Sequence, residues 1–227
     1  MITDNRNTGL THKRLLSIDL DYLSSTMKIN GDKIEKDENK FRFVRKLIDK
    51  YKDKIIFLIN HGDIVEELDK REKCTLYNWE IVNIDHHHDI YYSENERREI
   101  MRESYLHHCK VPERSLESDW LFWIGQNWSL SRVDEILNED SVVHRRVLSY
   151  GARFHFEFGS PLDPYGVDIF EKYFDYVCVA LSPHYVTPDD REYICEYLGL
   201  NLADFKEDHK IEITKEGEEV DDRLQQK

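Results

Sequence analysis

The segment Trp79-Glu80-Ile81-Val82-Asn83-Ile84-Asp85-His86-His87-His88-Asp89 joins an apolar run to five consecutive ionisable side chains. Residues 79–84 have the length and composition of a buried β-strand. Because side chains alternate along a strand that continues into a loop, we expect Asp85, His87 and Asp89 to converge on one side. Such a group at a buried strand end is costly unless a cation neutralises it. The segment therefore predicts a divalent-metal site, the alternative being an exposed polar loop.

Two other strand-like runs end in side chains of the same kinds. Asp19 and Asp21 follow residues 15–18, and His61 follows residues 55–60. Taken singly, the two aspartates could cap a helix or lie in a solvated loop, and His61 could be an ordinary loop residue. Because ligands of parallel α/β sheets bind outside the carboxyl ends of the strands, we expect the three strand ends to converge.

Together the three strand ends offer enough ligands for two adjacent metal ions. The candidate ligands are Asp19, Asp21, His61, Asp85, His87 and Asp89. Carboxylate oxygens mixed with imidazole nitrogens favour Mn²⁺ over the sulfur-rich sites of structural zinc. Four carboxylates balance the charge of two divalent ions. Two ions about 3.5–4 Å apart would lower the pKa of a shared water, which makes hydroxide available at neutral pH.

Apolar runs of strand length alternate with helical patterns along the chain. The expected strands are 14–20, 54–60, 79–84, 120–124, 152–158 and 176–181. The expected helices are 39–51, 64–73, 132–137, 163–174 and one that begins at Thr187-Pro188. Residues 25–38 are mostly polar and predict a surface loop. Apolar strands that alternate with helices predict a three-layer α/β/α domain with a mostly parallel sheet.

Composition and charge restrict the class of protein. The chain has 227 residues, of which 40% are hydrophobic, so we expect one catalytic domain over 1–213 and a charged tail over 214–227. The formal charge of −14 argues against a nucleic-acid partner and suits a cationic substrate. No apolar run approaches the roughly 18 residues of a membrane span, and residues 1–14 lack the core of a signal peptide. With four scattered cysteines, we expect a reduced, cytoplasmic protein that does not associate with membranes.

These motifs resemble those of the ureohydrolase superfamily, which includes arginases and deacetylases. Its members carry a metal-binding histidine after one strand, an Asp-x-His-x-Asp motif after the next and an Asp-x-Asp pair after another. Five blocks look like the branch that contains the peptide arginases: Ser17-Ile-Asp-Leu-Asp-Tyr-Leu23, Asn60-His-Gly-Asp-Ile-Val65, Asn83-Ile-Asp-His-His-His-Asp89, Ser118-Asp-Trp-Leu121 and Ser182-Pro-His-Tyr-Val-Thr-Pro188. The resemblance implies an arginase-like fold, two Mn²⁺ ions, and conversion of arginine side chains in a ribosomally made precursor peptide to ornithine and urea.

Two features depart from the ordinary arginase pattern. Asp19 and Asp21 come first along this chain, whereas the Asp-x-Asp pair of arginases follows the other metal motifs, so the motif order is permuted. Relatives of this branch often have Ser-Pro-Glu near a later strand end, where the glutamate holds the guanidinium. This chain has Ser182-Pro183-His184 there, and a neutral histidine is a poorer guanidinium partner than a carboxylate.

The implied reaction also requires a proton for the leaving amine, so we expect a histidine shuttle. The candidate catalytic residues are His88, His108 and His184. The candidate substrate-binding residues are Asp119, Trp120 and His184. A solvated surface role for His108 and a capping role for Asp119 stay open.

Two other functions are compatible with the sequence. A different metal-dependent amidohydrolase of the same superfamily, such as a deacetylase or an agmatinase-like enzyme, would use the same ligands. A metal-binding interaction protein without catalytic activity is favoured by the histidine at position 184.

Overall fold

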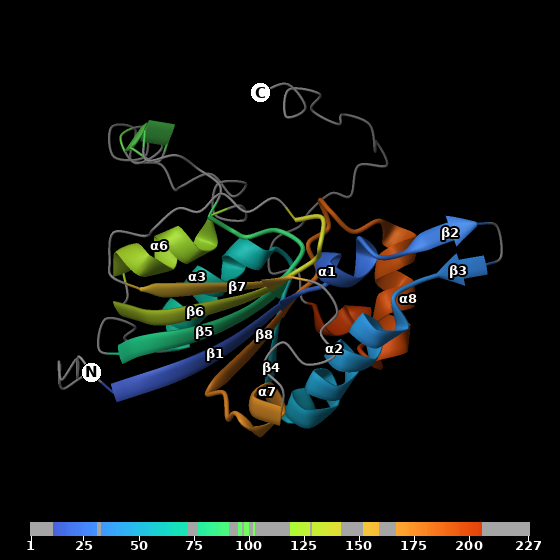
Figure 1. The fold of residues 1–227 in the computed structure, drawn as a ribbon, viewed down its shortest axis with the longest axis horizontal. Helices are drawn as coiled ribbons and strands as arrows, with labels where there is room; N and C mark the ends of the chain where they lie inside the picture. The colour runs from blue at the N-terminus through green and yellow to red at the C-terminus, as the bar shows by residue number, and fades with distance from the viewer. Residues whose placement is uncertain are drawn as a thin grey trace.

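A six-stranded parallel sheet forms the centre of the molecule (Figure 1). The structure, a computed structural model, describes residues 11–30, 33–71, 77–90, 95–96, 98–99, 102, 119–127, 129–141, 152–158 and 167–205. The strands are β1 (Thr11–Asp19), β4 (Ile55–Leu58), β5 (Tyr77–Asp85), β6 (Ser129–Leu137), β7 (Arg153–Phe158) and β8 (Tyr176–Ala180). They lie in the order β4-β8-β1-β5-β6-β7, and all five pairings are parallel. The predicted parallel α/β sheet is therefore confirmed.

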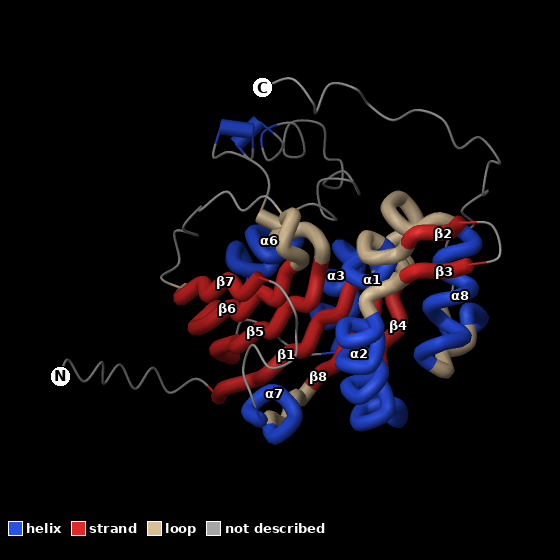
Figure 2. The backbone as a smooth tube through the Cα atoms, turned by 45° about the vertical axis from the view of Figure 1, so that its right-hand side comes forward, coloured by secondary structure: helices blue, strands red, loops and turns tan. Residues whose placement is uncertain are grey.

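Helices cover both faces of this sheet (Figure 2). One layer contains α1 (Asp21–Ser24), α2 (Glu38–Tyr51), α7 (Val167–Glu171) and α8 (Pro188–Leu198). The other contains α3 (Ile64–Arg71) and α6 (Trp120–Asn127). Short 3-10 turns cover Lys52–Lys54, His61–Asp63 and Leu202–Asp204. The arrangement is consistent with the three-layer α/β/α domain that the sequence predicts.

Alternation along β1 divides the interior into two apolar cores. Leu16 and Ile18 pack toward α2 and α8, whereas Leu15 packs toward α3 and α6. Ser17 and Asp19 share the face of Leu15, because residues two apart in a strand point the same way. The α3/α6 side of the sheet therefore carries polar groups toward the carboxyl end of β1.

Local signals set the boundaries of α2 and α8, and the predicted start of α8 at Thr187-Pro188 is confirmed. Asp37 caps α2 by accepting hydrogen bonds from two backbone amides. Thr187 caps α8, Pro188 occupies its first turn, and Gly199 ends it in the left-handed conformation at φ 70°.

Three sequence predictions are wrong. Residues 120–124 form helix α6 rather than a strand, because a short run apolar on all sides is also typical of a helix buried against a sheet. Residues 132–137 belong to β6 rather than to a helix. The spacing of Val133, Ile136 and Leu137 imitates a helical stripe, while acidic residues that are in fact buried lie between them. Residues 25–38 contain a hairpin of β2 (Lys28–Asn30) and β3 (Lys33–Glu35) instead of a plain loop.

The remaining predictions about chain organisation fall partly outside the described ranges. The tail over 214–227 lies outside them, as do residues 163–166 of the predicted helix 163–174. Within the described part of that prediction, α7 ends at Glu171 and residues 172–174 are not helical. No helix within the described ranges is long and apolar enough to cross a bilayer.

Candidate metal centre

The strand order brings the three predicted strand ends together. β1 lies between β8 and β5, with Ile18 paired to Ile84, so the residues that follow, Asp19 and Asp85, end neighbouring strands. β4 lies beyond β8, and its loop leads directly into His61. All six predicted ligands therefore gather at one edge of the sheet, although they come from separate segments of the chain.

His61 lies among three carboxylates. The distances from its Nδ1 to the nearest carboxylate oxygen are 3.1 Å for Asp19, 3.1 Å for Asp85 and 2.9 Å for Asp89. Its Nε2 is 2.5 Å from the hydroxyl of Ser17. Nδ1 itself makes no hydrogen bond of good geometry within the described part of the chain. Nδ1 thus faces anionic oxygens, and a neutral ring that donates its Nε2–H to the hydroxyl would direct the Nδ1 lone pair at a cation held among them.

A second group of ligands lies beside the first. Nδ1 of His87 is 2.7 Å from Asp21 Oδ2. Asp21, Asp85 and His87 offer ligand atoms that all lie within 4.8 Å of one another, as do Asp19, His61 and Asp85. Asp85 belongs to both groups. The two groups of candidate metal ligands therefore share one carboxylate.

Surrounding hydrogen bonds hold the carboxylates in place. Ser182 Oγ donates to Asp19 Oδ2 at 2.6 Å, and the backbone amide of Asp21 donates to Asp19 Oδ1 at 3.0 Å. The backbone amide of His87 and the side-chain amide of Asn83 donate to the two oxygens of Asp85, at 2.9 and 3.2 Å. Such partners fix the orientation of metal ligands and tune their basicity.

Two residues that contact the cluster have an unusual backbone conformation. Asp89 has a φ of 45° and Ser182 a φ of 47°, and they are the only non-glycine residues with positive φ in the described ranges. Residues other than glycine rarely adopt the left-handed region of positive φ, and such backbone strain clusters at functional sites. Here both strained residues touch the cluster, Asp89 through His61 and Ser182 through Asp19.

Without a cation, the cluster concentrates like charges in a buried volume. Burial and the charges of neighbouring carboxylates raise the pKa of Asp21 and that of Asp85 to about 7. Burial alone would lower the pKa of His87, but the hydrogen bond and charge of Asp21 raise it to about 10. Burial likewise opposes the charged form of His61, but Asp89 and its neighbours raise the pKa of that ring well above its usual value. The carboxylates and imidazoles thus share protons where a metal would supply positive charge.

Trp120 lies on the buried side of the cluster, against Asp89 and His61. Its Nε1 donates to Asp89 Oδ2, and its ring centroid is 5.0 Å from that of His61. The side chain is fully buried at the start of α6. Asp119, also buried, precedes this helix, and its backbone oxygen accepts from the amide of Phe122 at 3.0 Å.

The three candidate catalytic histidines have different surroundings. His88 is buried, and its Nδ1 accepts a hydrogen bond from the amide of Ile90 at 3.2 Å. His184 is exposed on the loop after β8, next to Tyr185. The ring of Tyr185 lies 4.6 Å from that of His87, so this loop borders the open side of the cluster. His108 lies outside the described residues.

Sequence reasoning missed several polar residues around the cluster. Ser17 and Asn83 each precede a predicted aspartate ligand by two positions, so strand alternation alone could have identified them. Glu135 is fully buried near Asp85 and Asp89, and the mistaken helix over 132–137 concealed it.

Asn138, at the end of β6, was also missed and joins several elements. Its Oδ1 accepts from the buried Lys40 of α2, and its Nδ2 lies 3.1 Å from His86 Nδ1 and 3.1 Å from the backbone oxygen of Tyr22. It thereby links α1, α2 and the loop that carries the predicted metal motif.

We expect replacement of Trp120 by phenylalanine to weaken metal binding without unfolding the protein. Phenylalanine keeps most of the packing against His61 but removes the N–H that orients Asp89. Loss of such a partner typically costs 10–100-fold in metal affinity. Calorimetric titration with Mn²⁺ measures this loss, and Trp123→Phe in the same helix serves as the control. Equal affinities for the two variants would contradict the orienting role.

No protein-family model, no curated protein and no solved structure matches this chain. The candidate metal centre is therefore argued from the positions of its residues alone.

Proposed function

We propose that this chain is a Mn²⁺-dependent hydrolase that converts arginine side chains of a peptide to ornithine and releases urea. The observation that supports it most is the sharing of Asp85 between two ligand groups. Asp19, Asp85, Asp89 and His61 would hold one ion, and Asp21, Asp85 and His87 the other. The donors are oxygens and imidazole nitrogens, which suit Mn²⁺. When bound, a pair of divalent ions lowers the pKa of a water molecule that they share.

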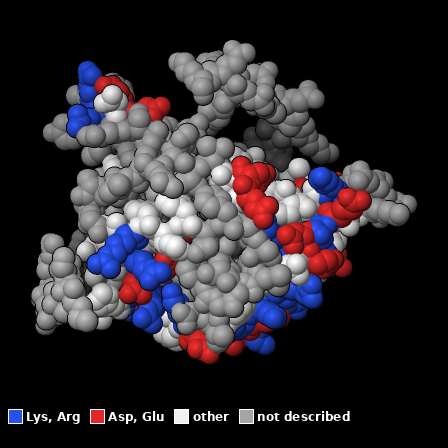
Figure 3. Space-filling model, in the orientation of Figure 1, with Lys and Arg blue, Asp and Glu red and all other residues white. Residues whose placement is uncertain are grey.

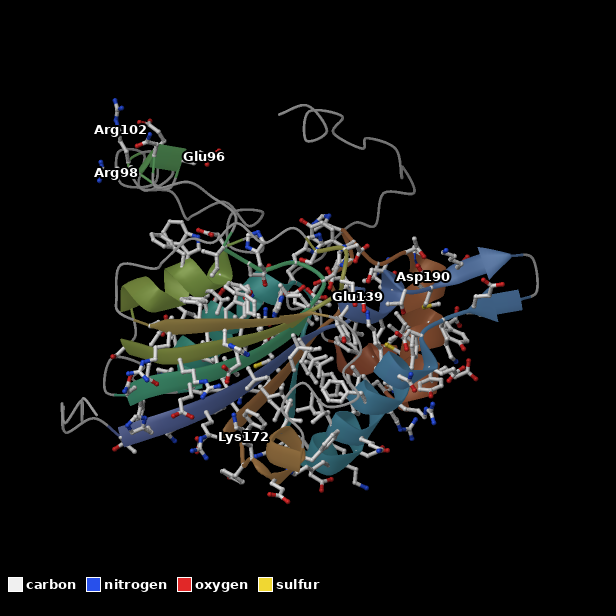
Figure 4. All side chains as sticks on the ribbon, viewed as in Figure 1. Glu96, Arg98, Arg102, Glu139, Lys172 and Asp190 are labelled. Atoms are coloured by element: carbon white, nitrogen blue, oxygen red, sulfur yellow. The ribbon has the colours of Figure 1, made fainter. Side chains whose placement is uncertain are left out.

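Charge at the rim of the site supports a cationic substrate. Acidic side chains lie exposed near the edge where the strands end (Figure 3). Glu139 and Asp140 follow Asn138 in the turn after β6, and Glu139 is labelled at this edge in Figure 4. Asp140 Oδ1 is 3.9 Å from His86 Nδ1, which connects the rim to the metal motif. A negative rim raises the local concentration of a guanidinium-bearing peptide. The choice of a peptide over free arginine rests on the family resemblance.

The exposed histidine of the β8 loop is the best-placed proton shuttle. Collapse of the tetrahedral intermediate requires a proton on the departing ornithine amine. His184 is exposed and lies two residues after Ser182, which donates to Asp19, whereas His88 is buried and bonded to the loop backbone. His184 also occupies the position at which relatives of the resembled branch carry a guanidinium-binding glutamate. Trp120, which contacts His61 and Asp89, and the neighbouring Asp119 are both buried at the start of α6 and would support the substrate pocket from within.

A substrate panel tests this proposal. Protein loaded with Mn²⁺ is incubated with arginine-containing peptides, free arginine, agmatine and an acetyl-lysine peptide, and products are identified by mass spectrometry and a urea assay. Urea with ornithine-containing peptide is the expected result, and Asp85→Asn is the inactive control. Putrescine or acetate as the product would assign an agmatinase-like enzyme or a deacetylase instead.

A non-catalytic metal-binding protein is the second candidate, and His184 favours it. An exposed imidazole replaces the carboxylate expected to hold a guanidinium. Binding of two Mn²⁺ ions per chain without turnover of any substrate in the panel would support this alternative over the hydrolase.

A further inference from the structure

Glu135 is a fully buried carboxyl group without a hydrogen-bond partner among the described residues. It lies in β6 with none of its surface exposed. Neither of its carboxylate oxygens makes a hydrogen bond of good geometry within the described ranges. A buried, uncompensated carboxylate costs far more free energy than a buried neutral group. The cost calls for either a proton on Glu135 or a cation beside it.

Asn83 is the neighbour through which Glu135 reaches the metal centre. The two residues are register partners in the parallel β5–β6 pairing, so their side chains stand side by side. Asn83 Nδ2 donates to Asp85 Oδ2 at 3.2 Å, and both Asn83 and Asp85 are fully buried. The other end of the amide, Oδ1, has no hydrogen-bond partner in the part of the chain that the structure describes. Three acceptor oxygens are thus buried together without a donor.

A single proton on Glu135 would remove its buried charge and supply a donor for Asn83 Oδ1. A protonated carboxyl has one O–H to donate, and Asn83 Oδ1 is the unpartnered acceptor beside it. Burial, together with the charges of Asp89 and Asp85, raises the pKa of Glu135 well above its usual value, and this outweighs the opposing effects of the Asn83 side chain and of His61. With Oδ1 engaged, the amide can no longer rotate, and its N–H₂ group stays directed at Asp85.

We propose that Glu135 is a buried carboxylic acid that donates to Asn83 Oδ1 and, through that amide, orients the carboxylate of Asp85. Glu135 is then a positioning residue, and it touches neither metal nor substrate. The inference rests on the metal centre of the proposed function but on no particular substrate. Because Asp85 belongs to both ligand groups, one misplaced carboxylate would disturb both ions.

Infrared spectroscopy tests the protonation directly. Protein labelled with ¹³C-glutamate is compared with Glu135→Gln at neutral pH, both in EDTA and with excess Mn²⁺. A carboxylic-acid C=O band that shifts with the label and is absent from the variant supports the proposal. Its absence from the wild-type protein in either condition overturns it. This measurement needs no turnover and no metal, so it stays informative if the hydrolase proposal fails.

The Mn²⁺ affinity of Glu135 variants tests whether this residue positions the carboxylate of Asp85. Glutamine supplies an N–H donor in place of the O–H, so Glu135→Gln should keep Mn²⁺ affinity within about threefold of the wild type. Leucine supplies no donor, so Glu135→Leu should lose about 10–100-fold. Glu66→Gln on the exposed face of α3 is the matched control. An equal loss in both variants would indicate a carboxylate that binds a cation, and unchanged affinity in Glu135→Leu would remove the positioning role.

Discussion

Replacing Asp85 by asparagine should abolish the response to Mn²⁺ while making the metal-free protein more stable. Asparagine keeps the size of the side chain and can still accept from Asn83, but it carries no charge for either ligand group. Loss of the shared carboxylate should reduce Mn²⁺ affinity at least 100-fold and eliminate turnover. His87→Ala, which removes a ligand of one group only, should likewise abolish turnover in a folded protein.

The gain in metal-free stability has an electrostatic cause. Burial and the charge of Asp89 raise the pKa of Asp85, so its ionised form destabilises the folded chain above neutral pH. Thermal unfolding in EDTA at pH 8 should therefore show a higher Tm for Asp85→Asn than for the wild type. Added Mn²⁺ should raise the Tm of the wild type alone. Asp49→Asn, on the exposed side of α2, is the control. A lower metal-free Tm for Asp85→Asn, or a Mn²⁺ response retained by it, would contradict the assignment.

The second large effect is a dependence of metal-free stability on pH that Mn²⁺ reverses. The folded pKa of Asp21 and that of Asp85 are about 7, above the ordinary value of 3.8, so the folded state holds protons that the unfolded state has lost. Stability from these groups is therefore lost as the pH rises from about 4 to about 7. The pKa of His87 is about 10 in the folded state, against an ordinary value of 6.5. The stability that His87 contributes is therefore lost as the pH rises from about 6.5 to about 10. Solvent screening reduces the contribution of His87, because 45% of its side chain is exposed.

The metal-free protein should accordingly lose on the order of 3 kcal/mol of unfolding free energy between pH 5 and pH 8.5. Mn²⁺ binds the deprotonated ligands and should stabilise the protein increasingly over the same range. Denaturant unfolding in EDTA and in Mn²⁺ measures both trends. Calorimetry in buffers of different ionisation enthalpy should also show protons released as Mn²⁺ binds. A metal-free stability that rises with pH across this window would show that the cluster does not share protons as the structure indicates.

The sequence identified the elements whose signals are local. The strand ahead of Asp85 is apolar almost throughout, and Thr187-Pro188 carries the pattern of a helix start, so each could be recognised without knowledge of its neighbours. Alternation at the strand ends also predicted the side chains that point toward the cluster. The same reasoning failed for α6 and β6, since a short apolar run or an i, i+3, i+4 spacing fits either structure until its burial is known.

Strand length and side-chain alternation are properties of adjacent residues, so carboxylates and imidazoles that follow buried strands could be predicted from the sequence. The folded arrangement was needed to show that His61 lies among three carboxylates, that Asp85 serves two groups of ligands, and that Glu135 lies behind them. These contacts depend on strand order. β1 lies between β8 and β5, and that order reflects how two apolar cores pack on opposite faces of one sheet rather than any pattern along a single segment.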